Sequence, residues 1–141
     1  MRAFCARMGA TVPQRKALVL KASRILLSEK PLPERLQAFL EALLEGPFPI
    51  RSGKLYLRKG EGLRLVAQLG GEAGGEGVAL SLEGGGRALG RLSLRRAPAA
   101  SLAPEDRLAL EEAAGILALA LLRERAERAE RVLRRAGECA T

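Results

Sequence analysis

The sequence has no histidine, no tryptophan and no asparagine, and Asp106 is its only aspartate. Histidine is the commonest general base in enzymes and a frequent metal ligand, so its absence removes the side chain on which most acid–base and metal chemistry depends. Nor does any remaining side chain offer an obvious base for a nucleophile. We therefore expect a chain that is not an enzyme and that holds no metal and no cofactor.

Aromatic residues and cysteines are also scarce. Two cysteines, Cys5 and Cys139, lie near opposite ends of the 141 residues and form no CxxC site. A chain of this length buries enough core to be stable without a disulfide. The aromatic residues are too few to provide stacking platforms for nucleic-acid bases; they are Phe4, Phe39, Phe48 and Tyr56.

No long apolar run is present. The longest, Gly115–Leu122, is far short of the about 20 residues that a membrane-spanning helix requires. The charged beginning and apolar run of a signal peptide are missing as well. We expect a soluble, cytoplasmic protein that does not contact a membrane, with an arginine-rich composition typical of a thermophile or a GC-rich source.

Positive charge is in excess, with a net charge of +8. Residues 1–30 carry seven basic side chains and one acidic side chain, a sum of +6, and residues 51–70 and 87–96 add +4 each. Acidic segments separate these basic ones, whereas a nucleic-acid binder gathers its basic groups in one stripe. Binding of nucleic acid or of an acidic surface through the N-terminal basic segment is therefore an alternative, and nucleic acid is not the favoured partner.

Two helices are predicted in the first third of the chain. Thr11-Val12-Pro13 is typical of a helix start. In the helix that follows, over 14–29, apolar residues occupy more than one face, which indicates two neighbours, one of which can be another subunit. A second helix lies between Pro31 and Gly46, and its apolar residues recur at helical spacing: Leu32, Leu36, Phe39, Leu40, Leu43 and Leu44.

Between residues 54 and 96 the apolar period changes to two, which predicts antiparallel strands over 54–58, 63–69, 78–83 and 87–96. In the second strand the alternation puts Leu63, Leu65, Ala67 and Leu69 on one face, opposite Arg64, Val66 and Gln68. The glycine-rich stretches 70–77 and 84–86 lack the phosphate-loop spacings GxxxxGK[ST] and GxGxxG. We interpret both as connections between strands.

A long helix is predicted from Pro104-Glu105-Asp106, where a proline and two acids suit the first turn, to about Ala136. At 1.5 Å per residue it measures about 45 Å, which is too long for a domain of this size. Glu–Arg pairs four residues apart, at 124–128, 127–131 and 130–134, support its second half. A row with spacings of three and four predicts a homodimer interface: Leu119, Leu122, Ala126, Ala129 and Leu133.

Five segments, in this order along the chain, resemble sequence patterns of GAF domains: LQAFLEALLE (36–45), GKLYLR (53–58), GLRLVA (62–67), GGGRALGRLSL (84–94) and LAPEDRLAL (102–110). The resemblance covers about residues 20–125. It implies an α+β fold with an antiparallel sheet of about four strands in the order 2-1-4-3, helices on one face and a long C-terminal helix. It also implies a role in signal transduction or regulation, in a family whose domains commonly pair through their first and last helices.

The sequence departs from this family in one region. GAF domains insert a further strand and helix before their penultimate strand, and this insertion roofs the ligand pocket; here only residues 70–77 occupy that place. The bilin-attaching and redox cysteines of the family lie in or near the roof, and neither Cys5 nor Cys139 matches them. The resemblance is therefore to a short member with a truncated pocket.

We divide the chain into a flexible basic segment (1–12), a GAF-like domain (13–122) and a coiled-coil-like helix extension (123–141). The favoured function is a non-catalytic signalling module that forms a homodimer and contacts an output protein through its terminal helices. The alternative is a sensor for a nucleotide or another small anion, bound on the cationic face of the sheet: Tyr56, Arg58, Arg64, Arg91 and Arg95.

Overall fold

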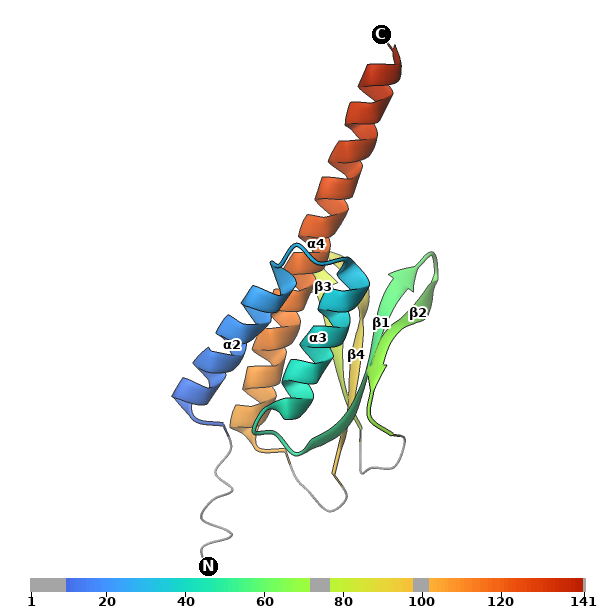
Figure 1. Ribbon diagram of the computed structural model, residues 1–141. Coiled ribbons are helices and arrows are strands. Elements are labelled where there is room, and N and C mark those ends of the chain that lie inside the picture. The colour runs from blue at the N-terminus through green and yellow to red at the C-terminus, as the bar shows by residue number, and fades with distance from the viewer. Residues whose placement is uncertain (1–9, 72–76, 98–101, 141) are drawn as a thin grey trace, which may run out of the picture.

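Three helices cover one face of a four-stranded antiparallel sheet, and the last helix extends well beyond that sheet (Figure 1). This computed structural model describes residues 10–71, 77–97 and 102–140, with side chains to Gly137. The described elements are α2 (Val12–Leu26), α3 (Leu32–Glu45), β1 (Ile50–Lys59), β2 (Gly62–Leu69), β3 (Gly77–Gly84), β4 (Arg87–Arg96) and α4 (Pro104–Ala140). The strands lie in the order β2-β1-β4-β3, so the predicted α+β class and strand order are confirmed.

The helices form two layers on the sheet. α3 and α4 pack directly on the strands, and α2 lies outside them, in contact with both (Figure 1). Strand side chains alternate between the two faces, so Leu55 of β1 and Leu92 of β4 point toward the helices, where they are fully buried with Phe39 of α3 and Leu117 of α4. None of the described helices covers the other face of the sheet, which we call the open face.

The two central strands, β1 and β4, approach each other closely at Gly90. A Cβ atom at this position would overlap the carbonyl oxygen of Tyr56, so no side chain fits there without a shift of the backbone. Gly90 is therefore required for the pairing of β1 with β4.

The N-terminus of α2 is fixed by a capping box. The Thr11 Oγ1 accepts a hydrogen bond from the Gln14 amide at 3.2 Å, and the Gln14 Oε1 accepts one from the Thr11 amide at 2.8 Å. The helix start predicted at Thr11 is confirmed. Ala10 is buried and α2 begins at Val12, close to the boundary drawn after residue 12; that boundary stays a prediction, because residues 1–9 lie outside the described part of the chain.

A β-bulge in β2 changes the alternation of that strand. Leu55 of β1 pairs with Ala67, but the next residue, Tyr56, pairs with Leu65. Val66 is therefore an extra residue on β2. Side chains before and after such a residue no longer follow a single period of two.

The bulge corrects the prediction for β2. Directly paired residues of antiparallel strands share a face, so Leu65 lies with Tyr56 on the open face, and Leu63 lies there with Arg58. Arg64 pairs with Leu57 and lies on the helix-facing side. The expected common face of Leu63, Leu65, Ala67 and Leu69 is therefore wrong, and so is the placing of Arg64 with Tyr56.

α4 is buried in its first half and exposed in its second. Leu110, Leu117 and Leu121 pack into the core, whereas every described side chain from Arg128 onward is exposed. The helix has 37 residues and so spans about 55 Å; its second half projects from the domain (Figure 1). We call residues 123–140 the tail, which ends beyond the predicted Ala136.

Only one of the three predicted Glu–Arg pairs of the tail forms. Glu130 and Arg134 lie 2.9 Å apart, as predicted. Glu127 instead pairs with Arg123 at 3.0 Å, and Glu124 pairs with Arg35 of α3 at 3.1 Å. The other two predictions are wrong, because a surface pair contributes only a few tenths of a kcal/mol and a glutamate can reach an arginine on either side.

The connection between β2 and β3 is short, since Leu69 ends one strand and Gly77 begins the next. The predicted glycine-rich stretch fills this interval, and its residues 72–76 lie outside the described part of the chain.

Among the described helices, none combines the length and the apolar character needed to span a bilayer.

Candidate functional site

α2 and α4 lie side by side and run in the same direction (Figure 1). Near their N-termini the Ala10 amide donates a hydrogen bond to the Asp106 Oδ1 at 2.7 Å. One and a half turns further on, Arg15 and Glu112 form an ion pair at 3.9 Å. A third connection, near the end of α2, involves Arg35 and is described below. These contacts at successive levels hold the two helices in one register.

Asp106 is the buried anchor of this helix pair. Its side chain lies in the first turn of α4, where the helix dipole favours a negative charge, and the residue is only 2% exposed. A buried carboxylate is costly unless it accepts hydrogen bonds, and the Ala10 amide provides one. Sequence reasoning identified Asp106 only as part of a helix start, because its partner lies 96 residues away in the chain.

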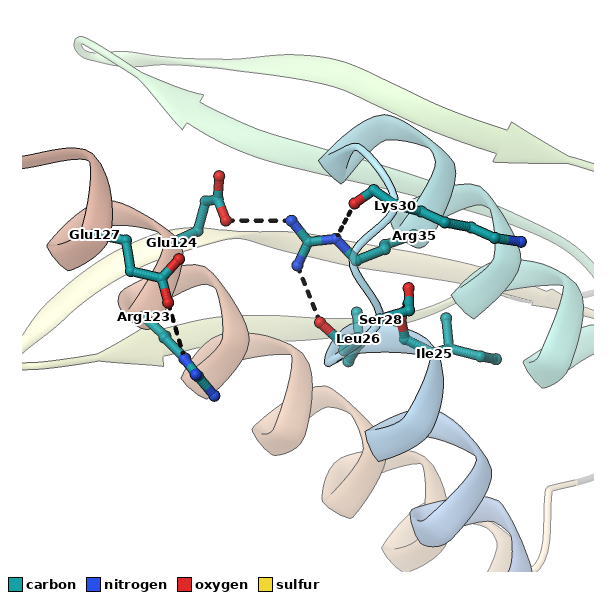
Figure 2. A network of polar contacts seen from close by, with 8 residues as sticks. All are labelled: Ile25, Leu26, Ser28, Lys30, Arg35, Arg123, Glu124 and Glu127. Atoms are coloured by element: carbon teal, nitrogen blue, oxygen red, sulfur yellow. Dashed lines mark hydrogen bonds and ion pairs between the residues drawn. The ribbon is translucent and has the colours of Figure 1, made fainter. Parts of the chain in front are cut away.

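Arg35 connects all three helices (Figure 2). The Arg35 Nε donates to the Lys30 carbonyl at 2.8 Å, and the Nη1 donates to the carbonyl of Leu26, the last residue of α2, at 2.9 Å. The Nη2 donates to the Glu124 Oε2 of α4 at 3.1 Å. The two charged side chains are only 12% and 19% exposed. We call these four residues the Arg35 clamp; it lies where the tail leaves the domain.

Large apolar side chains are exposed on the outer sides of α2 and α4. Together we call these side chains the α2–α4 face: Val12, Leu20, Leu27, Leu108 and Leu119. A groove of about 500 Å³ lies along this face, lined mainly by α2 residues and by Glu112 of α4. α2 thus carries apolar side chains on two sides, one buried against the domain and one exposed, as the spread of its apolar residues predicted.

The predicted interface row of α4 is divided by the structure. Leu119 and Leu133 are 68% and 73% exposed, and Ala126 and Ala129 are exposed between them. Leu122 is half-buried and packs on the turn between β3 and β4, where a Cβ atom on Gly84 would lie 2.5 Å from the Leu122 Cδ1. Leu122 therefore belongs to the domain, and the other four residues lie on the free surface.

Of the predicted ligand residues, Tyr56, Arg58, Arg91 and Arg95 share the open face, and Arg64 does not. Arg91 pairs with Tyr56 across the centre of the open face, and Arg95 lies toward the far end of the same strand. The arginines are exposed and Tyr56 is half-buried. Arg64 lies on the helix-facing side of the sheet, as the register of β2 requires. Arg58 lies at the end of β1, where its Nε donates to the Gly60 carbonyl at 3.1 Å.

Within residues 10–71, 77–97 and 102–137, no three Cys, His, Asp or Glu side chains are grouped so that they could hold a metal ion. Cys5 and the side chain of Cys139 lie outside these ranges. The features that the described residues do build are an exposed apolar face, a buried hydrogen-bonded aspartate and a set of contacts between helices at the root of the tail.

Comparison with solved structures identifies this arrangement of helices and strands. A GAF domain from Pseudomonas syringae pv. tomato superposes with a TM-score of 0.63 and covers 83% of this chain and 93% of its own, at 18% identity. The chain has the GAF fold. The nlh2 GAF domain of A. aeolicus in an inactive state gives a TM-score of 0.64, with 79% of this chain and 98% of that domain covered at 12% identity.

The GAF fold is shared with an enzyme as well. The reduced form of fRMsr from Staphylococcus aureus, a protein also solved in complex with substrate, gives a TM-score of 0.64 over 76% of this chain and 94% of its own, at 14% identity. No protein-family model matches the sequence, and no curated protein matches it significantly. At these identities the comparisons establish the GAF fold of this chain and no activity.

Proposed function

We propose that this chain is a non-catalytic signalling module of the GAF type, which forms a homodimer through the α2–α4 face and the tail. The observation that carries the proposal is the row of exposed apolar and small side chains that continues from the domain into the tail. Leu108, Leu119, Ala126 and Leu133 all lie on the side of α4 that does not contact its own domain. Their spacing of seven or eleven residues keeps them on one helix face.

The tail supplies a second argument. Helices in proteins owe most of their stability to the packing of an apolar face rather than to intrinsic propensity. From Arg128 onward the described side chains are all exposed, so a single chain gives the tail little packing. A second tail along Ala126, Ala129 and Leu133 would bury that face, and the two alanines would allow close approach of the helices.

A parallel arrangement fits this surface best. In a parallel dimer the α2–α4 faces of both domains meet at one end while the tails pair beyond them. An antiparallel pairing of the tails would place the domains at opposite ends and leave Leu20 and Leu108 exposed. The proposed dimer is therefore parallel, with a twofold axis along α4.

In the proposed module, the Arg35 clamp would transmit a conformational change of the domain to the tail and so to the output protein. It joins the end of α2 to Glu124 at the root of the tail, so the two helices move there as one unit. An output protein would then contact the paired tails. The GAF domain of a protein described as a sensor histidine kinase, and a GAF sensor protein from Burkholderia vietnamiensis, share this fold, which supports a signalling role.

The experiment is a measurement of molar mass by light scattering at micromolar concentration. We expect twice the chain mass for the wild type and the monomer mass for Leu119→Glu with Ala126→Glu, because four charges would then face each other across the dimer axis. The matched control is Leu65→Glu, an exposed leucine on the open face, which should leave the dimer intact. A monomeric wild type, or an equal effect of the control, would refute the proposal.

A further inference from the structure

A cationic cleft lies at the end of the domain from which the tail projects. The β1–β2 turn, the beginning of β4 and α4 border an open hollow of about 570 Å³, lined by exposed residues: Arg58, Gly60, Gly86, Arg87, Ala88 and Arg125. A smaller hollow of about 200 Å³ shares Arg58 and Arg125 and adds Arg128. Two strand turns and the root of the tail thus bring four arginines together.

Among the described residues, no carboxylate forms an ion pair with an arginine of this cluster. The lining of the larger cavity contains no acidic side chain. Glu124, which lines the smaller hollow, is already bound to Arg35. Arg87, Arg125 and Arg128 form no ion pair with another described residue. The positive charges are therefore available to an anion from solution.

The turns leave room for an anion beside these side chains. Gly60 and Gly86 have positive φ angles of 63° and 75°, and a Cβ atom on either glycine would meet open space. The backbone of both turns is therefore accessible. Arg58 is oriented by its hydrogen bond from Nε to the Gly60 carbonyl, which leaves its two terminal nitrogens without a described partner.

We propose that this cleft binds a small anion with two or more phosphate groups, contacted by Arg58, Arg87 and Arg125. Guanidinium groups match phosphate oxygens with paired hydrogen bonds, and three of them suit a ligand with several charges. The hollow is polar, and its volume of about 570 Å³ leaves room for a di- or triphosphate chain. This differs from the alternative expected on the sheet, since only Arg58 is common to both sets of residues.

The location also indicates what such a ligand would do. Arg125 and Arg128 follow the buried Leu121 by four and seven residues, so they lie on the domain side of α4 rather than with Leu119 and Ala126. A bound anion would bridge the turns to the root of the tail without blocking the proposed dimer interface. The cleft and the dimer are therefore independent, and each can be tested without the other.

The test is titration calorimetry of the full chain with sodium tripolyphosphate at physiological salt. We expect one site per chain with a dissociation constant of about 10–100 µM. Arg87→Gln and Arg125→Gln should each weaken binding about fivefold. The matched control is Arg95→Gln, an exposed arginine of the open face, which should change the affinity less than twofold. All three side chains are exposed, and circular dichroism will verify that the variants fold.

The results separate this site from other sources of binding. No saturable heat at millimolar ligand, or an equal loss in the Arg95→Gln variant, would overturn the proposal. A single-stranded oligonucleotide that displaces tripolyphosphate and loses affinity equally in all three variants would indicate a general basic surface and would also overturn it. Unchanged binding by the Leu119→Glu, Ala126→Glu variant would support it even if the chain proved monomeric.

Discussion

Replacing Arg35 by alanine should measure how strongly the three helices are tied together. The change removes the hydrogen bonds to the Leu26 and Lys30 carbonyls and the ion pair with Glu124. Partly buried, charge-assisted hydrogen bonds contribute about 1.5 kcal/mol each at the lower end of their range, and the exposed contact to Lys30 adds little. We expect the free energy of unfolding to fall by about 2–3 kcal/mol, and the Tm by about 8 °C.

The matched control for this change is Arg134→Ala. The Arg134–Glu130 pair is slightly shorter than the Arg35–Glu124 pair, 2.9 Å against 3.1 Å, but its side chains are 70% and 65% exposed. An ion pair in water contributes at most about 1 kcal/mol. We therefore expect Arg134→Ala to change the stability by less than about 0.5 kcal/mol, so that burial rather than distance accounts for the difference.

Urea unfolding followed by circular dichroism measures both variants. The comparison belongs in the Leu119→Glu, Ala126→Glu background, since association would otherwise add a concentration-dependent contribution to stability. Arg35→Lys should recover less than half of the loss, because one ammonium group cannot reach three acceptors in different directions. Equal losses for Arg35→Ala and Arg134→Ala would refute the reasoning about burial.

Three further predictions concern other parts of the chain. Asp106→Ala should lower the free energy of unfolding by about 2 kcal/mol, because the amide of its partner stays buried without an acceptor, and urea unfolding will measure it; Asp106→Asn, which keeps an acceptor, should cost less. Gly90→Ala should cost more than about 3 kcal/mol by the same assay, since its Cβ would meet the Tyr56 carbonyl, whereas Gly62→Ala, which meets nothing within 4 Å, should cost less than about 1 kcal/mol. Assays with peroxide and sulfoxide substrates should find no reduction, and an activity that disappears in Cys139→Ser would contradict the non-catalytic proposal.

Helices and strands whose apolar residues recur at a regular spacing could be predicted from the sequence. Leu92 and Leu94 alternate with arginine and serine in β4, and Leu36, Leu40 and Leu43 recur at helical spacing in α3. Both periods depend only on neighbouring residues, and the structure has the corresponding strand and helix. The strand order could be predicted only from the resemblance to GAF domains, because the apolar period within a strand does not indicate which strands pair.

Features that depend on distant partners could not be predicted. Valine is common in regular strands, so nothing about Val66 itself indicates a bulge; the bulge is visible only in the pairing of β2 with β1. Arg35 and Glu124 are 89 residues apart. The spacing of four residues along one helix predicted a pair between Glu124 and Arg128 instead. The same limit applies to Asp106, whose burial follows from the way α2 meets α4.

The candidate interface was predicted in outline. The spacing of three and four found the exposed positions Leu119, Ala126 and Leu133, which lie on one face of α4. It also included Leu122, because spacing along one helix cannot show which side chains its own domain already covers. The proposed contribution of α2 through Leu20 could not be predicted from spacing, because it depends on the packing of two helices that are far apart in the sequence.

The most direct test of the central claim is a disulfide cross-link between two tails. In a Cys5→Ser, Cys139→Ser background, Ala129→Cys places one thiol on the proposed dimer axis, where two Cα atoms of a parallel pair approach within the about 4.4–6.8 Å of a disulfide. We expect mild oxidation to convert most of this variant into a covalent dimer. Arg128→Cys, at the neighbouring exposed position, points away from the axis and should stay monomeric under the same conditions. No cross-link at Ala129→Cys, or equal cross-linking of both variants, would contradict the proposed parallel homodimer.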